Sequence, residues 1–375
     1  ICLESGIRTG RYTSPHLVSL RERIKIDGVD ISETAFAEHA SEVRKAAESL
    51  VSDGALDVTP TFFEQITAIG LLAFRSAEIE LVILETGLGG RYDATTAAKA
   101  ELAAVTRIDL DHQQYLGNSI SEIAAEKAAI IRPDSRVILM HQTREAEQVL
   151  IGQCREAGVE PVWATTDVQT TLAGTPGYPI YCHDFRTEKD FYPNIESGLP
   201  GSHQAENASV AIGIAEQLQE LGFKITHFDI CIGLETAVHP GRLEFDRGIL
   251  LDGAHNIGGA RALAQFLKDF ADGPVTLVFG AMRDKDVAPV LDVLAPLAST
   301  VILTEPSNER SMPAAELRTL LPESVRPETV TVTRSVEDAL STARAGKERH
   351  LVVVTGSLHL VGAVKRILEE NRREI

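Results

Sequence analysis

Residues 81–93 read LVILETGLGGRYD, and this stretch decides the fold. Four consecutive apolar residues are typical of a strand buried on both faces of a parallel sheet. The glycines that follow allow backbone to approach a ligand closely, and Glu85, Arg91 and Asp93 add charge. Ligands collect in loops that leave the carboxyl ends of such strands, so this loop is a candidate site. A tight turn without function would also account for the glycines.

Segments of helical and strand periodicity alternate around this stretch. Residues 160–200 lack helical periodicity and predict short antiparallel strands or loops. The alternation elsewhere predicts an α/β fold with a parallel sheet covered on both faces by helices. Helices are predicted over 32–51, 61–77, 120–131, 144–157 and 204–221, with a shorter one from Phe228, and strands over 102–108 and 136–140.

A second α/β pattern begins after Pro240-Gly241. A chain of 375 residues exceeds what one hydrophobic core usually serves. We therefore expect two domains, the first over residues 1–237 and a smaller second one over 238–375. The strands of the second domain are predicted near 249–252, 275–280, 299–305, 329–333 and 351–356.

The composition is that of a soluble globular protein. A formal charge of −18 and a pI near 5.1 repel phosphate backbones, which disfavours nucleic acid as a partner. No apolar run approaches the roughly 18 residues that span a bilayer, so we expect no membrane partner. The four cysteines form no CxxC pair, which disfavours a zinc site or a disulfide framework and favours a cytoplasmic location.

Polar residues also follow the next predicted strand along the chain. Asp109, Asp111 and His112 come directly after it, at the sheet edge toward which Glu85 also points. A carboxylate oxygen and an imidazole nitrogen can share a divalent ion, although Mg2+ prefers oxygen and water. A capping aspartate beside a surface histidine is the alternative.

Lys127 has an unusual place in the helical pattern. It falls on one face of the predicted helix together with Ile123, Ile130 and Ile131. The common interpretation is an ammonium group that reaches past apolar neighbours to solvent. The alternative is a partly buried lysine of lowered pKa that is available for covalent chemistry, because burial disfavours the charged form.

The second domain repeats the combination of a strand end and polar residues. Asp252, His255 and Asn256 follow a predicted strand and precede a predicted helix. Upstream, Arg242 lies at the predicted domain boundary, where a guanidinium could grip phosphate. A structural arginine paired with a carboxylate is the alternative.

Read together, these segments resemble the folylpolyglutamate synthase and dihydrofolate synthase family of the Mur ligase superfamily. The resemblance extends from about residue 7 to about residue 366. It rests on residues 12–17 (YTSPHL), 21–24 (RERI), 61–64 (TFFE), 85–95 (ETGLGGRYDAT), 111–112 (DH), 116–117 (LG), 125–127 (AEK), 203–204 (HQ) with Asn207, 240–242 (PGR), 252–256 (DGAHN) and 356–358 (GSL).

The resemblance implies a Mur-ligase-like, P-loop-type ATPase domain that binds ATP and pterin, followed by a smaller Rossmann-like glutamate-ligase domain. It implies ATP-dependent ligation of L-glutamate to dihydropteroate or reduced folates through an acyl phosphate, which the amine of glutamate attacks. The implied cofactors are ATP and Mg2+, with K+ as an additional candidate ion. The implied partners are small molecules only, bound by a monomer.

The resemblance also implies roles for individual residues. Lys127 would be carried as a carbamate that holds a second metal, and His255 would lie near the incoming glutamate. The magnesium ligands would be Ser14, Glu85 and His112, the ATP-binding residues Asn207, Arg242 and Asp252, and the pterin-binding residues Thr61, Phe62, Phe63, Glu64, Tyr92, Asp93 and Ala94.

Three features depart from the family pattern. Thr96 stands where Asn is usual and Ala129 where Gly is usual, and both are small changes. The TGTNGKGS-like phosphate loop should lie, with the first strand, just ahead of residue 1. Without the backbone amides of this loop, the phosphates of ATP lack their hydrogen-bond donors. We therefore expect these 375 residues to be a fragment of a longer reading frame, inactive alone; ATP turnover by them would contradict this.

A catalytically dead folate-binding homologue that keeps the pterin pocket is the main alternative, and a phosphate loop encoded upstream would favour the enzyme. A peptidoglycan-type amino acid ligase is disfavoured because residues 14–16 and 61–64 look folate-type. An NAD-linked enzyme is weaker still, because no GxGxxG follows a strand.

Overall fold

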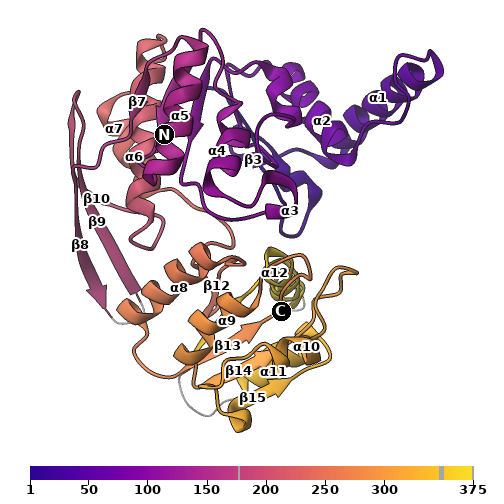
Figure 1. Cartoon of the computed structure of the whole chain (residues 1–375), viewed down its shortest axis with the longest axis vertical. Coiled ribbons are helices and arrows are strands. Elements are labelled where there is room, and N and C mark those ends of the chain that lie inside the picture. The colour runs from indigo at the N-terminus through magenta and orange to yellow at the C-terminus, as the bar shows by residue number, and fades with distance from the viewer. Residues whose placement is uncertain (176–177, 346–349, 374–375) are drawn as a thin grey trace. The chain divides into compact units, whose positions relative to one another are not determined.

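The computed structural model describes residues 1–175, 178–345 and 350–373. The chain divides into two compact units, and each is described by itself (Figure 1). Unit 1 consists of Ile1–Asp167, Phe185–Tyr192 and Glu206–Gly233, and unit 2 consists of Val168–Asp184, Pro193–Ala205 and Leu234–Ile375.

A four-stranded sheet in unit 1 has the order β3-β2-β1-β4. β1 (Thr9–Tyr12) pairs in parallel with β4 (Leu81–Leu84) and antiparallel with β2 (Ile24–Ile26), which pairs with β3 (Val29–Asp30). The sequence predicted β4 but none of its three companions. They are four, three and two residues long, too short for a period-2 pattern to be recognised.

β4 is less buried than its composition predicts. Val82 and Ile83 are 37% and 46% exposed, although successive residues of a strand point to opposite faces of the sheet. The prediction of a strand buried on both faces is therefore wrong here. The reason is that β4 is the edge strand of its sheet, where β1 is its neighbour on one side.

A second sheet of unit 1 contains β5 (Leu102–Val105), β6 (Arg136–Leu139) and β7 (Pro161–Trp163), all parallel. The predicted parallel sheet is thus divided in two, because β4 and β5 belong to different sheets. β7 also corrects the prediction of antiparallel strands or loops after residue 160, since it continues the parallel order.

The predicted helices of unit 1 are confirmed, and side chains cap several of them. Ser32, Thr61, Ser119 and Thr143 each accept a hydrogen bond from an amide of the first turn. The helices are α1 (Glu33–Ser52), α2 (Phe62–Ser76), α3 (Gln113–Leu116), α4 (Ile120–Ala128), α5 (Arg144–Ala157), α6 (Gln204–Glu220) and α7 (His227–Glu235).

Separate hydrophobic cores support the two sheets of unit 1. Tyr12, Ile24 and Ile66 are buried in the core that α1 and α2 share with the first sheet. Ile123 and Leu150, from α4 and α5, are buried in a second core with the β6 strand. Each sheet therefore has its own hydrophobic support.

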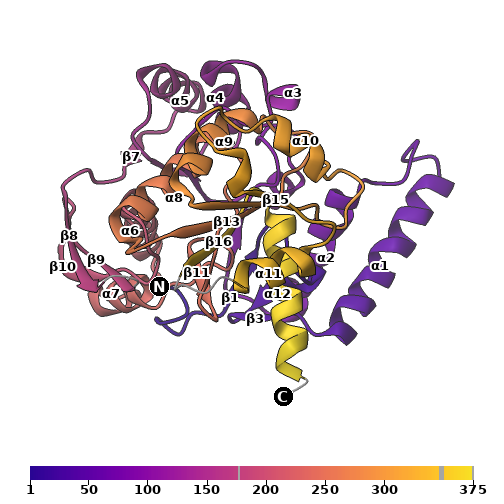
Figure 2. The same cartoon turned by 90° about the horizontal axis from the view of Figure 1, so that it is seen from below.

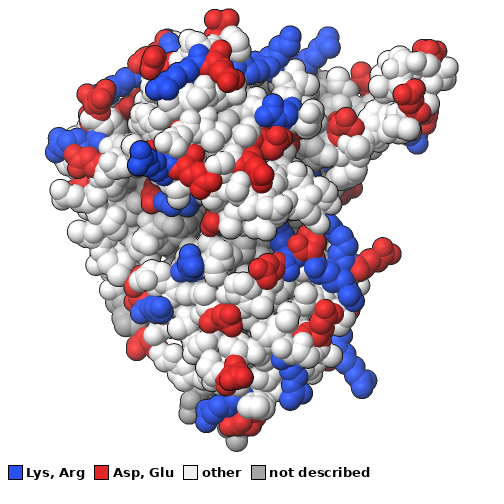
Figure 3. Space-filling view, viewed as in Figure 1, with Lys and Arg blue, Asp and Glu red and all other residues white. Residues whose placement is uncertain are grey.

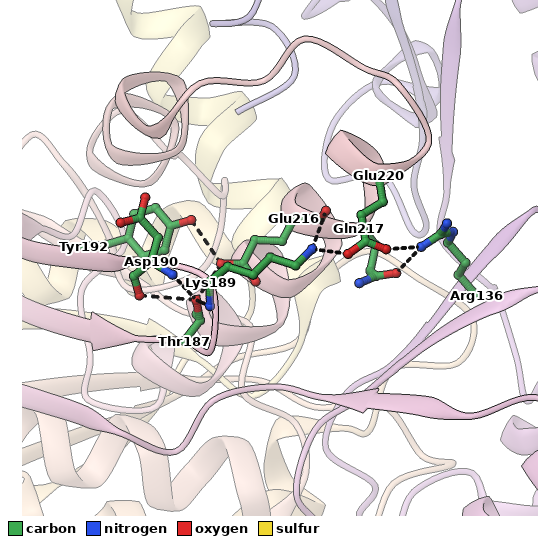
Figure 4. Close-up of polar contacts among 8 residues, drawn as sticks. All are labelled: Arg136, Thr187, Lys189, Asp190, Tyr192, Glu216, Gln217 and Glu220. Atoms are coloured by element: carbon green, nitrogen blue, oxygen red, sulfur yellow. Dashed lines mark hydrogen bonds and ion pairs between the residues drawn. The ribbon is translucent and has the colours of Figure 1, made fainter.

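A third sheet has the order β10-β9-β8 and consists of β8 (Val168–Thr175), β9 (Tyr178–Arg186) and β10 (Phe191–Glu196). The turn between β9 and β10 belongs to unit 1 and bonds to α6 (Figure 4). There the buried Glu216 carboxylate accepts hydrogen bonds from the hydroxyls of Thr187 at 2.7 Å and Tyr192 at 3.1 Å.

Further bonds fix the same turn. Lys189 donates to the backbone carbonyl of Glu216 at 3.1 Å and pairs with Glu220, which Arg136 of β6 also contacts (Figure 4). Most of these charges are partly exposed, so the buried hydroxyl–carboxylate bonds should carry more of the stability.

We expect Tyr192→Phe to lower the free energy of unfolding by about 1–2 kcal/mol, because a buried carboxylate loses one of its donors. Urea denaturation measures the change. Tyr115→Phe is the matched control: Tyr115 is 68% exposed, and its substitution should change stability by less than about 0.5 kcal/mol. Equal effects of the two substitutions would contradict the role given to Glu216.

Unit 2 is built on a six-stranded sheet with the order β11-β12-β16-β13-β14-β15. All neighbours are parallel except β11, which pairs antiparallel with β12. The five predicted strands are confirmed, and β11 was missed because its three residues, Glu-Phe-Asp, form no apolar run. The strands are β11 (Glu244–Asp246), β12 (Ile249–Leu251), β13 (Val275–Phe279), β14 (Thr300–Leu303), β15 (Val330–Val332) and β16 (Leu351–Thr355).

Helices cover the sheet of unit 2. Figure 2 shows the sheet between the pair α8 and α9 and the pair α11 and α12. Every residue of β12 and β13 is buried, as expected for parallel strands covered on both faces. The helices are α8 (Ile257–Phe270), α9 (Ala288–Leu294), α10 (Ala314–Thr319), α11 (Val336–Arg344) and α12 (Leu358–Arg373).

Over the described residues, no helix combines the length and apolar character needed to cross a membrane. On the face shown in Figure 3, the side chains of Lys and Arg are interspersed with those of Asp and Glu. This face therefore presents mixed charge rather than a continuous basic surface.

Candidate functional site

The loop after β4 is folded by one carboxylate. The buried Asp93 accepts hydrogen bonds from the amides of Gly87 at 2.7 Å and Leu88 at 3.0 Å. Its other oxygen accepts from the amide of Thr95 at 3.0 Å and its hydroxyl at 2.6 Å. Asp93, which was predicted to bind pterin, therefore fixes the backbone conformation of the glycine loop through these hydrogen bonds.

Gly87 is required by close packing within the loop. A Cβ atom at this position would lie 2.3 Å from the ring of Phe63, which packs edge-on against Tyr12 with the ring centroids 6.1 Å apart. From the sequence, two explanations were open for the loop glycines: close approach of the backbone to a ligand, or a tight turn. For Gly87 the structure shows a packing reason.

We expect Gly87→Ala to lower the free energy of unfolding by about 1–3 kcal/mol, because the Phe63 ring must move out of a packed position. Gly152→Ala is the control, since a Cβ there meets nothing within 4 Å inside α5. That change should stabilise by about 0.5–1 kcal/mol. Thermal unfolding of both variants checks the opposite signs, and a neutral Gly87→Ala would refute the packing argument.

The same loop is fastened to α4. The backbone amide of Arg91 donates to the backbone carbonyl of Glu126 at 3.1 Å, and the side-chain Nε of Arg91 donates to the Glu126 carboxylate at 2.9 Å. A Cβ atom on Gly90 would lie 2.7 Å from the Glu126 carbonyl and 3.0 Å from that of Lys127. The glycine loop therefore lies directly against the helix turn that carries Lys127.

Lys127 is half-buried in the last turn of α4. Burial lowers the pKa of its amine, while the carboxylates of Asp111 and Asp93 act in the opposite direction. The prediction that Ile130 and Ile131 share a helix face with Lys127 is wrong, because α4 ends at Ala128. The partial burial belongs to the second of the two interpretations that the pattern left open, a partly buried lysine of lowered pKa.

Ser14 and Glu85 meet at the carboxyl ends of β1 and β4. The parallel register pairs Tyr12 with Leu84, and the amide of Ser14 then donates to the Glu85 carboxylate at 2.9 Å. His112 follows β5, on the other sheet, in a left-handed backbone conformation with φ 52°. The structure thus brings two of the three predicted magnesium ligands into contact and places the third at a separate strand end.

The chemistry of this set suits a hard cation. A serine hydroxyl and a carboxylate supply the oxygen donors that Mg2+ prefers. Over the described residues, no group of three or more His, Cys, Asp or Glu side chains is arranged to hold a metal by itself. A magnesium ion here would therefore need the serine oxygen, water or substrate oxygens to complete its shell.

The segment 61–64 has a structural use that the sequence could have shown. Thr61 caps α2, and Glu64 returns a bond to the Thr61 amide at 2.7 Å, so the pair forms a capping box. The Thr61 hydroxyl also donates to the Glu64 carboxylate at 2.7 Å, and this bond, together with the bond from the Thr61 amide, lowers the pKa of the Glu64 carboxyl. Phe62 is 58% exposed and Tyr92 is 91% exposed, so both aromatic rings remain available to a ligand.

In unit 2, Asp252 follows β12 and is buried. Its oxygens accept from the amides of Leu243 and Ala254, each at 2.9 Å. Burial raises the pKa of this carboxyl, and the Arg242 charge and the two amides oppose the rise. The structural alternative for Arg242, an arginine beside a carboxylate, is therefore supported by its electrostatic interaction with Asp252.

The remaining predicted residues lie at helix starts. His255 Nδ1 is 2.8 Å from the carbonyl of Gly253, which fixes the ring after β12, and Asn256 caps α8. Asn207 is exposed on the first turn of α6, beside the ion pair of Glu206 with Arg107. Ala94 begins a short 3-10 helix over Ala94–Ala98.

Sequence reasoning missed Arg23. This arginine is 7% exposed, and its Nε donates to the Nδ1 of His16 at 3.0 Å. The sequence offered no local signal for this burial, because arginine is mostly exposed in folded proteins.

Comparison with known protein families matches residues 36–215 to the Mur ligase middle domain and residues 241–358 to the Mur ligase, glutamate ligase domain. The fold and the site thus define the Mur class of ligases. Over 374 residues the chain is 30% identical to the dihydrofolate synthase/folylpolyglutamate synthase of Bacillus subtilis, covering 98% of this chain and 85% of that protein. The chain belongs to the dihydrofolate synthase/folylpolyglutamate synthase family.

Two further comparisons agree. The folylpolyglutamate synthase of Mycobacterium tuberculosis, complexed with ADP and AMPPCP, matches with a TM-score of 0.88, 30% identity and coverage of 97% of this chain and 87% of that one. A probable bifunctional folylpolyglutamate synthase/dihydropteroate synthase of Halobacterium salinarum is 33% identical over 365 residues, 96% of this chain. The chain spans 44% of the length of that relative.

Proposed function

We propose that this protein is an ATP-dependent ligase that joins L-glutamate to dihydropteroate, to reduced folates or to both. The observation that carries the proposal is the contact of Ser14 with Glu85 beside a glycine loop that Arg91 fastens to the Lys127 helix. Membership of the family supports it, because the Bacillus subtilis relative is named for this activity.

The proposed reaction has two steps. A carboxylate oxygen of the acid attacks the γ-phosphorus of ATP, so that ADP leaves and an acyl phosphate forms. The amine of glutamate then attacks the acyl carbon, inorganic phosphate leaves with the C–O bond electrons, and the new amide loses a proton. Water must be excluded meanwhile, since it would hydrolyse the acyl phosphate.

Ser14, Glu85 and His112 are the proposed magnesium ligands. When bound, Mg2+ would supply charge neutralisation for the phosphoryl group in transfer. The chain's own contribution is orientation: the Ser14 amide fixes one Glu85 oxygen. We propose K+ as a further ion that the site could bind.

Lys127 is proposed to carry a carbamate. Its neutral amine would add to CO2 and release one proton, which turns a cation into an anion able to hold a second metal. The lowered pKa supports this, because only the uncharged amine has the lone pair that attacks CO2.

The remaining roles follow from exposure and position. Phe62 and Tyr92 offer exposed rings to the pterin, and Thr61, Phe63, Glu64, Asp93 and Ala94 shape the segments that carry them. Asn207, Arg242 and Asp252 are the proposed nucleotide-binding residues, and His255 the residue near glutamate. Residues 1–237 are accordingly proposed to bind ATP and pterin, and 238–375 to form the glutamate-ligase domain.

We also propose a monomer that acts in the cytoplasm on small molecules. The four cysteines, Cys2, Cys154, Cys182 and Cys231, form no disulfide in the described part of the chain, which suits a reducing compartment.

The decisive experiment is mass spectrometry of dihydropteroate and of tetrahydrofolate after incubation with the natural full-length protein, ATP, Mg2+ and glutamate. Reactions without ATP are the control. Gain of one glutamate on dihydropteroate assigns the synthase step, gain on tetrahydrofolate assigns tail extension, and gain on both assigns a bifunctional enzyme. No gain on either acid by correctly folded protein would favour a folate-binding homologue without ligase activity.

A further inference from the structure

Arg23 is a buried cation, only 7% exposed. It ends a short 3-10 helix, Leu20–Arg23, at the entrance to β2. Its Nε donates to Nδ1 of His16 at 3.0 Å, and its guanidinium carbon lies 5.4 Å from the centroid of the Phe62 ring. Arg23 is also close enough to the Tyr12 hydroxyl to lower the pKa of that group, against the larger rise caused by burial.

Over the described residues, no Asp or Glu lies within ion-pair distance of Arg23. Arg21, in the same helix, shows the ordinary arrangement: it pairs with Glu33 at 3.6 Å and donates to the carbonyl of Ile31 at 3.1 Å. Removing a guanidinium from water without an anion is costly, so such groups are usually neutralised by a partner or a ligand. Arg23 therefore has the properties of a preformed anion site.

The surroundings indicate which anion would bind. His16 lies two residues after Ser14, whose amide contacts Glu85, so Arg23 supports the loop that begins at the candidate metal ligands. On its other side is Phe62, the exposed ring at the start of α2. An acid substrate with its carboxylate on Arg23 would therefore lie along Phe62, in one of the two segments proposed to bind the pterin-bearing acid.

We propose that Arg23 binds the carboxylate of the acid substrate and thereby positions it for phosphorylation. This rests on the proposed function and extends it to a specificity-determining residue. The rigid, planar guanidinium can bind a carboxylate through two parallel hydrogen bonds. Its cation–π contact with Phe62 and its hydrogen bond to His16 fix the orientation of the guanidinium plane. Arg23 would thus select an acid over the corresponding uncharged amide.

The test is equilibrium binding of dihydropteroate and of its carboxamide, measured by pterin fluorescence without ATP. The wild-type protein should bind the acid more tightly than the amide. Arg23→Met should weaken binding of the acid about 10- to 100-fold, which is the effect of losing one hydrogen bond between charged groups. Binding of the amide should be unchanged. Arg21→Met, from the same helix, is the matched control and should change neither.

Several outcomes separate the possibilities. Equal weakening of acid and amide by Arg23→Met would show a purely structural role and overturn the inference, as would unchanged acid binding. If Arg23→Met does not fold, Arg23→Lys replaces it: loss of the fork should lower the acid-to-amide preference by about tenfold, and an unchanged preference overturns the inference. Wild-type protein that binds neither compound would instead contradict the proposed function.

Discussion

Glu85→Gln should lower the rate of ATP-dependent glutamate ligation by about 100- to 1,000-fold, because a neutral amide replaces a charged oxygen donor where phosphate charge develops. The substitution is nearly isosteric. The backbone amide of Ser14 donates to the Glu85 carboxylate at 2.9 Å, and the side-chain oxygen of glutamine can accept the same hydrogen bond. The backbone of the loop should therefore be retained while the charge is lost.

The chain offers a matched control for this change. Glu80 lies at the opposite end of β4, and its carboxylate also accepts a backbone amide, that of Arg8 at 3.0 Å. Glu80→Gln should leave ligation within about twofold of wild type, since surface charges of this kind contribute little. Raising the Mg2+ concentration should partly restore Glu85→Gln. A Glu85→Gln protein with near wild-type activity at low Mg2+ would exclude Glu85 as a metal ligand.

Lys127→Arg should lower ligation by about 100-fold or more, although it keeps a positive charge at the same site. Arginine stays protonated at any accessible pH and cannot form the carbamate. The exposed Lys268, also in the last turn of a helix, is the control, and Lys268→Arg should have no effect. Incubation with 13C-labelled bicarbonate should give a carbamate NMR signal in the wild-type protein and none in Lys127→Arg.

The lowered pKa of Lys127 also fixes the sign of a pH effect. Carbamate formation needs the neutral amine, whose fraction rises with pH, and burial shifts that rise to lower pH than for a free lysine. Removing CO2 should therefore reduce wild-type activity most strongly at acidic pH, with activity returning on addition of bicarbonate. Full activity of Lys127→Arg, or activity indifferent to CO2 at every pH, would contradict the carbamate.

Local sequence patterns predicted much of the architecture. The period of apolar residues identified α1, α2 and α5 within one residue of their ends. The five parallel strands of unit 2 were predicted in the same way, because each is a short, mainly apolar run. Patterns failed for β1, β2 and β11, whose residues form no continuous apolar run.

The candidate site was predicted only as a set of positions. The sequence placed Glu85, Asp93 and Lys127 at strand ends or on a helix, but it could not distinguish their physical states. The structure shows that both oxygens of Asp93 are occupied by the loop itself, whereas Glu85 is exposed and bonded to the Ser14 amide. Such differences depend on which backbone amides face each carboxylate.

The sequence by itself determined the elements, their order and the polar residues at their ends, because periodicity and capping act between residues a few positions apart. Only the tertiary structure decided that β4 and β5 lie in different sheets, that Gly87 makes room for Phe63, and that Arg23 is buried against His16 and Phe62. The physical reason is that strand pairing, close packing and burial join residues far apart in the chain, and a local pattern carries no record of those partners.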